Sequence, residues 1–463
     1  MAPIDRRAFL QQSGGGLGAI AAGWLAREHD GHGPHHAPRA RRVVQIFLSG
    51  AASQCDTFDH KPALIARNGQ PFDPGGEVEL FQSDPGAVMQ SPWRWRRYGE
   101  CGKHVSDLVP HLGRCVDDVA FLHGMVSKTN VHGPATFLQT TGFVLPGFPS
   151  MGAWISYGLG STNDDLPTYV VLPDARGYAP GGPRNWAAGF LPATHQGTAI
   201  RPERPEPIAN LFPRPDDRPA AATEHDARAL RRLLDARHAE AHSADSRLDA
   251  RIRSFELAAS LQIEAPGVLD LTGESASTRR LYGLDDPRTE DFGRRCLLAR
   301  RLLEKGVRFV QIWSGADNGF PRRNWDSHED LAKDHADMAY EMDRPTAALL
   351  VDLKQRGLLD DTIVYWTTEF GRMPCSQGQK GRDHNPFGFT SWLAGGGVQG
   401  GVSHGATDEW SFRAVDGITY GYDVHATILH LLGIDHERLT VRVGGIDRRL
   451  TDVHGHVLHP ILA

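Results

Sequence analysis

Short runs of apolar residues alternate with helical patterns along most of the chain. Six apolar runs predict strands, at residues 43–50, 121–126, 169–173, 307–313, 362–371 and 389–397. Between some of them, apolar positions recur at helical spacing, in residues 291–306, 335–357 and 423–433. Near-continuous apolar strands that alternate with helices are typical of a mostly parallel sheet covered on both faces. The pattern therefore predicts an α/β fold, with a central mostly parallel sheet flanked by helices.

Residues 201–263 depart from this alternation. They are rich in Ala, Arg, Asp and Glu, and two Pro-rich turns are followed by a long polar helical pattern. We interpret this segment as a helical insertion into one domain that spans residues 43–463.

The first 42 residues have the layout of an export signal and a linker. Arg6 and Arg7 precede Phe9 and Leu10, and a weakly apolar Gly/Ala stretch follows as far as Ala26. This arrangement resembles the twin-arginine signal of bacterial proteins that are exported in the folded state. Residues 28–42 are rich in His, Pro and Arg and predict a flexible linker. We therefore expect the twin-arginine machinery as a partner and a periplasmic or extracellular location.

Composition narrows the classes of function. The 50 basic and 56 acidic side chains give a net charge of −6, which provides no basis for a nucleic-acid partner. No run of 18 apolar residues appears, so we expect no membrane span once the signal is removed. The chain has 23 His but only 5 Cys, which favours metal or acid–base chemistry over disulfides.

Polar clusters follow three of the predicted strands. Because the carboxyl ends of parallel strands share one edge of a sheet, these clusters are expected to converge there. Mixed Asp, Glu and His sets suit zinc, manganese or a similar ion, whereas oxygen-only sets suit calcium or magnesium. We predict a site for a divalent metal ion (zinc, manganese or calcium). The clusters are Ser53, Asp56 and Asp59; Asp326 and His328; and Glu369, Asp383 and His384.

Several of these segments together resemble a known family. It is a sulfatase-like family of exported bacterial proteins, a domain of unknown function grouped with the alkaline phosphatase and sulfatase superfamily. The resemblance runs from about Val43 to His456 and implies an alkaline-phosphatase-like fold. It is carried by IFLSGAASQCDTFDHKP, NWDSH, TTEFGR, GRDHNPFGFTSWLAGGG, HGATDEW and DVHATILHLLGIDHERLT.

The resemblance also implies roles for individual residues. TTEFGR is similar to a strand-end motif of the superfamily, which makes Glu369 a metal ligand. NWDSH is similar to an earlier Asp/His pair and gives Asp326 and His328 the same role. In GRDH, Asp383 and His384 are either ligands or contacts to an anionic substrate.

Two departures from the superfamily pattern change the expected chemistry. Ser49 stands where an acidic ligand is usual, and Asp56 or Asp59 could substitute for it from the following turn. Residues 132–142 are similar to the sulfatase signature, but His132 replaces the cysteine nucleophile and Thr136 replaces the arginine. This position therefore offers no cysteine to convert to formylglycine.

Several mechanisms follow from these departures. A metal-activated water could attack the ester, His132 could act as nucleophile or general acid, or Thr136 could be the nucleophile one helical turn later. Alternatively, His132 is a metal ligand or a helix cap and hydrolytic activity has been lost. The expected function is an exported metal-dependent hydrolase of sulfate or phosphate esters, on a small molecule or polysaccharide. The alternative is a catalytically inactive binding or scaffold protein that retains the fold.

Overall fold

The computed structural model describes most of the chain. The described residues are 33–81, 84–163, 165–209, 246–319 and 322–463, together with 211, 223, 226, 230, 233–235 and 237–238. The predicted export signal lies outside them, as does much of the predicted helical insertion.

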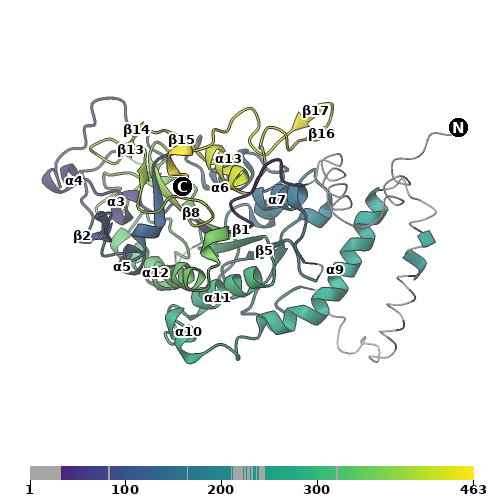
Figure 1. Ribbon diagram of the computed structural model, residues 1–463. Helices are drawn as coiled ribbons and strands as arrows, with labels where there is room; N and C mark the ends of the chain where they lie inside the picture. Colours follow the sequence, from purple (N-terminus) through teal and green to yellow (C-terminus); the bar gives the residue numbers. More distant parts are fainter. Residues whose placement is uncertain are drawn as a thin grey trace.

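A central sheet forms the middle layer of the molecule (Figure 1). Its strands are β1 (Arg42–Leu48), β4 (Val119–Val126), β5 (Tyr169–Leu172), β6 (Thr198–Ala199), β7 (Phe309–Ser314), β8 (Thr362–Thr368), β11 (Phe389–Ala394), β12 (Ser403–His404) and β15 (Thr419–Tyr420). Their order is β12-β4-β11-β8-β1-β7-β5-β6, and β15 also pairs with β4. Only β11 runs antiparallel to its neighbours in this sheet, as far as the described residues show. The prediction of an α/β fold with a mostly parallel sheet is confirmed, and each of the six apolar runs overlaps one of these strands.

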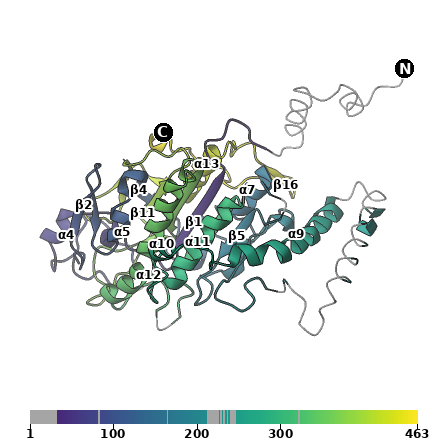
Figure 2. The same cartoon turned by 60° about the horizontal axis from the view of Figure 1, so that its bottom comes forward.

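Helices cover both faces of the sheet. The longer ones are α6 (His132–Thr141), α7 (Met151–Leu159), α9 (Ser246–Leu269), α11 (Glu290–Glu304), α12 (Leu331–Gln355) and α13 (Gly421–Leu431). Successive side chains of β1 point to opposite faces of the sheet, so each face packs against its own layer of helices. Val44 and Ile46 belong to the core cluster that contains α11 and α12 residues, whereas Val43 and Phe47 belong to the cluster that contains α7 and α13 residues. Figure 2 shows α11 and α12 lying across one face of the sheet.

Shorter elements complete the described structure. The short helices are α3 (Gln54–Thr57), α4 (Pro62–Ala66), α5 (Pro110–Gly113) and α10 (Ala276–Leu281), with 3₁₀ turns at Val116–Asp118, Gly182–Trp186, Ala193–His195, Leu359–Asp361 and His459–Ile461. Four two-stranded ribbons pair β2 (Trp95–Tyr98) with β3 (Lys103–Ser106), β9 (Gly371–Arg372) with β10 (His384–Asn385), β13 (Ala406–Thr407) with β14 (Ala414–Asp416), and β16 (Val441–Val443) with β17 (Ile446–Arg448). None of the described helices combines the length and the apolar composition that crossing a membrane requires.

The region of the predicted insertion is described mainly by α9. This helix begins inside the segment 201–263 and continues to Leu269. Leu261, Ala265 and Val268 are buried in the same core cluster as α11. The C-terminal half of α9 is therefore packed against the body of the domain.

The described part of the predicted linker lies against the domain. The Gly33 N–H donates to the Gly158 carbonyl (2.7 Å), and the N–H groups of Arg39 and Ala40 both donate to the Leu431 carbonyl (2.8 and 2.9 Å). Residues 33–41 are thus held by backbone hydrogen bonds, which differs from the expected flexible linker. Their His- and Pro-rich composition gave no sign of this because the contacts use backbone atoms.

A close backbone contact sets the end of β1 against the loop that follows β7. The Trp325 N–H donates to the Ser49 carbonyl (2.9 Å). Gly50 has φ +106°, and a Cβ there would lie 2.5 Å from the Asp326 nitrogen and 2.7 Å from that of Trp325. Only glycine fits at this position, because both the backbone conformation and the space exclude a side chain.

We predict that Gly50→Ala destabilises the protein much more than Gly69→Ala. Gly69 also has a positive φ, +80°, but a Cβ there would meet nothing within 4 Å. The Gly69 variant should cost about 1–2 kcal/mol of unfolding free energy from backbone strain alone. The Gly50 variant adds a backbone collision and should cost at least about 3 kcal/mol. Thermal unfolding midpoints of the two variants test this, and equal midpoints would contradict it.

Candidate metal centre

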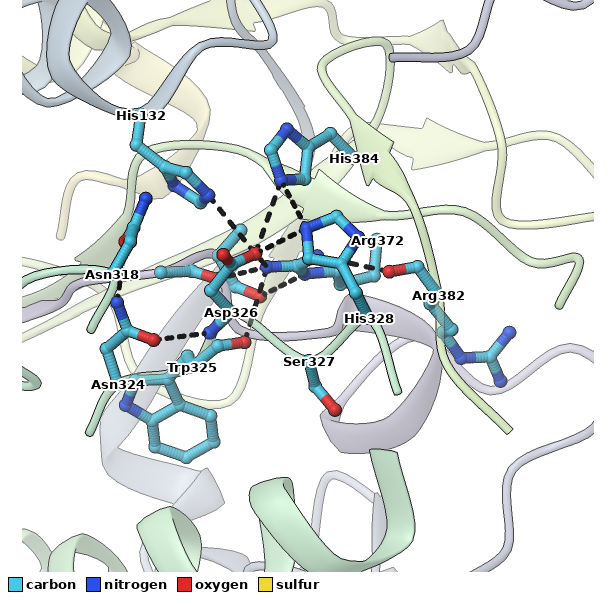
Figure 3. A network of polar contacts seen from close by, with 12 residues as sticks. His132, Asn318, Asn324, Trp325, Asp326, Ser327, His328, Arg372, Arg382 and His384 are labelled. Atoms are coloured by element: carbon cyan, nitrogen blue, oxygen red, sulfur yellow. Dashed lines mark hydrogen bonds and ion pairs between the residues drawn. The ribbon is translucent and has the colours of Figure 1, made fainter. Parts of the chain in front are cut away.

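Four side chains from three separate segments meet at the carboxyl edge of the sheet (Figure 3). They are His132, Asp326, His328 and His384, and one ligand atom from each lies within 4.8 Å of the others. The Asp326 Oδ1 lies 2.8 Å from the His328 Nε2, 3.2 Å from the His132 Nε2 and 3.3 Å from the His384 Nε2. The Nε2 atoms of His328 and His384 are 3.0 Å apart. Three imidazoles thus point the same ring nitrogen at one carboxylate oxygen.

The secondary structure explains this convergence. His132 is the first residue of α6, Asp326 and His328 lie in the loop between β7 and α12, and His384 lies on β10. β10 pairs with β9 in antiparallel register, which returns the chain to the end of β8. At Gly381, just before β10, a Cβ would lie 1.7 Å from the His328 carbonyl oxygen, so the two segments touch through their backbones.

The second nitrogen of each imidazole faces an oxygen atom. The His132 Nδ1 donates to the Glu369 Oε1 (2.7 Å), and the His384 Nδ1 donates to the backbone carbonyl of Asn130 (2.6 Å). The His328 Nδ1 donates to the Gln377 Oε1. Acceptors at these positions fix the proton on Nδ1 and leave the Nε2 lone pair free, as in histidines that bind metals.

This arrangement fits a bound cation. The three Nε2 lone pairs and the Asp326 carboxylate face one another at 2.8–3.3 Å, and they repel unless a positive charge lies between them. Three nitrogens and one oxygen are a donor set for zinc, manganese or a related transition ion. Calcium prefers six to eight oxygen ligands, so this set suits it poorly.

Arg372 holds the Asp326 carboxylate in place. Its Nη2 donates to the Asp326 Oδ1 (2.5 Å), and its Nε donates to the Ala51 carbonyl (3.0 Å). The guanidinium is fully buried. Burial alone would raise the pKa of Asp326, but the charge of Arg372 and the polar contacts of the three imidazoles lower it far below its usual range. Asp326 is therefore ionised.

The imidazoles respond differently to burial. For His384, burial is the main cause of a pKa lowered to about 3, so this ring is neutral. For His132, burial also lowers the pKa, but the adjacent Asp326 and Glu369 carboxylates outweigh it and the net direction is upward.

Two of the expected metal ligands lie close to the cluster but outside it. The Glu369 Oε1 accepts from the His132 Nδ1 and from the Gly50 N–H (2.7 Å each), which places this carboxylate behind His132. The Asp383 Oδ1 accepts from the His384 N–H (2.8 Å). In the described structure, each of these carboxylates contacts a histidine of the cluster and neither belongs to it.

Asp56 belongs to a different buried interaction. Its carboxylate accepts from the Arg382 Nε (2.8 Å) and Nη2 (3.2 Å) and from the Ser53 Oγ (2.5 Å). Asp59, the other substitute considered for Ser49, accepts from Thr407 and Ser411. The structure thus places both carboxylates in other interactions and outside the cluster.

The two candidate nucleophiles lie on α6. His132 has one ring nitrogen at Glu369 and the other at the cluster. Thr136 lies one turn further along the helix and is fully buried, and its Oγ1 has no hydrogen-bond partner among the described residues. The sequence left His132 open between a catalytic role and a ligand role, and the structure places its Nε2 within the cluster.

Sequence reasoning did not identify three groups that shape the centre. The Asn130 group is a backbone carbonyl, which every residue type provides, so the sequence could not indicate it. Gln377 lies in a loop without a pattern of its own. Arg372 stands in the segment TTEFGR, where a cation three residues after the strand-end Glu369 was the available sign.

Comparisons with known proteins identify a family. Residues 40–462 match a family model described as "Protein of unknown function (DUF1501)". No curated protein matches the chain.

Solved structures give distant likenesses. A sulfatase, PsFucS1, from Pseudoalteromonas sp. is 12% identical, with 90% of this chain and 71% of that chain covered and a TM-score of 0.36. The lipoteichoic acid synthase LtaP from Listeria monocytogenes is 11% identical, with 89% and 78% covered and a TM-score of 0.36. The phosphonate monoester hydrolase of Agrobacterium radiobacter is 12% identical, with 92% and 77% covered and a TM-score of 0.36. Likenesses at this level establish no shared activity.

We predict that His384→Ala and Asp383→Asn differ in metal content. The first removes a ligand and should abolish stoichiometric binding, whereas the second keeps the oxygen that accepts from the His384 N–H and should retain it. Elemental analysis of the purified variants decides between them. Loss of metal in Asp383→Asn alone would reverse the assignment.

A second variant tests the support behind His132. Glu369→Gln replaces the carboxylate that orients the ring and should weaken metal affinity about 10- to 100-fold while the ion still binds. Competition with a chelator of known affinity measures the change. A complete loss of metal would instead indicate that Glu369 is itself a ligand.

Proposed function

We propose, for a chain that belongs to the DUF1501 family of proteins of unknown function, the activity of a metal-dependent hydrolase of sulfate or phosphate esters. One observation carries the proposal: three imidazoles with their Nδ1 protons fixed by oxygen acceptors direct their Nε2 atoms at the Asp326 carboxylate. His132, Asp326, His328 and His384 would hold the ion.

A bound divalent ion polarises an ester oxygen and lowers the pKa of a coordinated water towards about 7. The chain's own residues would orient the imidazoles, keep Asp326 ionised and place cations beside it. Arg372 touches one oxygen of the Asp326 carboxylate and Arg322 the other (3.2 Å). These two guanidinium groups make the surroundings of the ion favourable for an anionic ester.

Water is the nucleophile we propose. Both ring nitrogens of His132 are engaged, and Thr136 is buried one turn beyond it. The sulfatase-like segments of the sequence support an ester of sulfate or phosphate as the substrate. Because His132 replaces the signature cysteine, the reaction we propose proceeds without formylglycine.

The N-terminal sequence supports a location outside the cytoplasm. We propose that residues 1–42 direct export by the twin-arginine machinery and that the domain acts in the periplasm or beyond it. A polysaccharide or small-molecule ester is the substrate class that suits such a location.

Burial of the cluster favours a second candidate function. The side chains of His132, Asp326, His328 and His384 are 7%, 6%, 10% and 2% exposed. Structural metal sites are closed in this way, whereas catalytic sites keep an open position. The second candidate is therefore a non-catalytic binding or scaffold protein that holds a structural ion.

We predict that the metal-loaded protein hydrolyses nitrophenyl sulfate or nitrophenyl phosphate, and that a chelator abolishes turnover. His328→Ala should lower kcat/KM at least about 100-fold, because it removes a ligand. His456→Ala, which changes an exposed histidine, serves as the control and should leave the rate unchanged. Turnover that persists without metal would contradict the hydrolase proposal. Stoichiometric metal without turnover of either ester would favour the second candidate.

A further inference from the structure

A cavity of about 350 Å³ adjoins the candidate metal centre. It lies beside the N-terminal ends of α11 and α12. Its wall includes Arg322 and Asn324, and its four cations are balanced by the four carboxylates of Asp291, Asp334, Asp337 and Glu341. Two of these residues reach the cluster. The Arg322 Nη1 donates to the Asp326 Oδ2 (3.2 Å), and the Asn324 Oδ1 accepts from the Asp326 N–H (3.0 Å).

The other cations of this wall are turned to other partners. Arg176 donates twice to the buried Asp174 carboxylate (2.8 Å each). Arg288 contacts Asp337 (3.4 Å), and Lys333 contacts the same carboxylate (3.2 Å). Among the described cations that line the cavity, only Arg322 bonds to a residue of the cluster.

An exposed carboxylate occupies the outer edge of the Arg322 guanidinium. The Arg322 Nε donates to the Glu329 Oε2 (3.1 Å), and its Nη2 donates to the Glu329 Oε1 (2.8 Å). The Glu329 side chain is 60% exposed, whereas that of Arg322 is 17% exposed. Because the Glu329 carboxylate lies mostly in solvent, water can replace its contacts when it leaves, and its two-point geometry is one that an incoming oxyanion can reproduce.

The same edge of a guanidinium binds two oxygens of a sulfate or phosphate group. We infer that Glu329 is a resting partner that occupies Arg322 until the oxyanion of the substrate takes its place. Arg322 then holds the anion on one edge while its Nη1 remains at the Asp326 carboxylate, beside the imidazoles. The assignment of the anion to a substrate rests on the proposed function, but the exchange at Arg322 can be measured without turnover.

Titration calorimetry with inorganic phosphate and with inorganic sulfate tests the exchange, on metal-loaded and metal-free protein. Glu329→Gln removes the competing charge and should tighten anion binding about three- to ten-fold. Arg322→Met removes the guanidinium fork and should weaken binding at least about ten-fold. Arg322→Lys keeps the charge without the fork and should fall between the wild type and Arg322→Met.

A matched ion pair elsewhere in the chain provides the control. The Arg449 Nη1 lies 3.2 Å from the Glu437 Oε1. Their side chains are 19% and 65% exposed, which is close to the exposed fractions of Arg322 and Glu329. Arg449→Met and Glu437→Gln should leave anion affinity unchanged. If Glu437→Gln tightens anion binding as much as Glu329→Gln does, the effect arises from the overall charge of the protein, and the inference is overturned.

The outcomes separate this inference from the proposed function. If the protein binds metal and hydrolyses the ester, but neither Glu329→Gln nor Arg322→Met changes the anion affinity, the inference is overturned and the proposed function stands. If Arg322→Met also loses metal, Glu329→Gln still decides, because it leaves the Arg322–Asp326 bond intact. Tighter anion binding in Glu329→Gln without any turnover would support the exchange and contradict the hydrolase. In an active enzyme, Glu329→Gln should lower KM with little change in kcat.

Discussion

The convergence of three imidazole lone pairs on one buried carboxylate is the constraint on which the centre depends. The Nε2 atoms of His132, His328 and His384 lie 2.8–3.3 Å from the Asp326 Oδ1, and a cation between them removes the repulsion. Oxygen acceptors at every Nδ1 keep the lone pairs aimed inward. Arg372 holds the carboxylate, and the close backbone approach at Gly50 brings its loop to the end of β1.

Much of the architecture follows from local sequence pattern. Six apolar runs became strands because a strand buried on both faces needs nearly continuous apolar residues, as in β1 and β8. The same reasoning placed Asp326, His328 and His384 at one edge, where the structure brings them together. Which of the remaining carboxylates would reach the cluster depends on tertiary contacts. Asp56 meets Arg382, which is distant in sequence, and Glu369 meets the outer nitrogen of His132.

Charge connects the candidate metal centre to its surroundings. Asp326 is shared between the imidazoles, the buried Arg372 and the partly exposed Arg322, so that one carboxylate links the interior of the site to the wall of the adjoining cavity. The burial of the cluster explains how an ion would be retained. The Arg322 guanidinium lies between the cluster and the cavity, which explains how an anion could approach the ion. The adjoining cavity supports the proposed hydrolase of anionic esters, whereas the closure of the cluster by itself favours a structural metal site.

X-ray absorption at the edge of the bound metal tests the central claim most directly, because it reports the ligand atoms around the ion without an assay of activity. The structure predicts one ion per chain with three imidazole nitrogens and one carboxylate oxygen from the protein, at about 2.0–2.2 Å for zinc. A spectrum without imidazole scattering, or protein that binds no metal at all, would contradict the account.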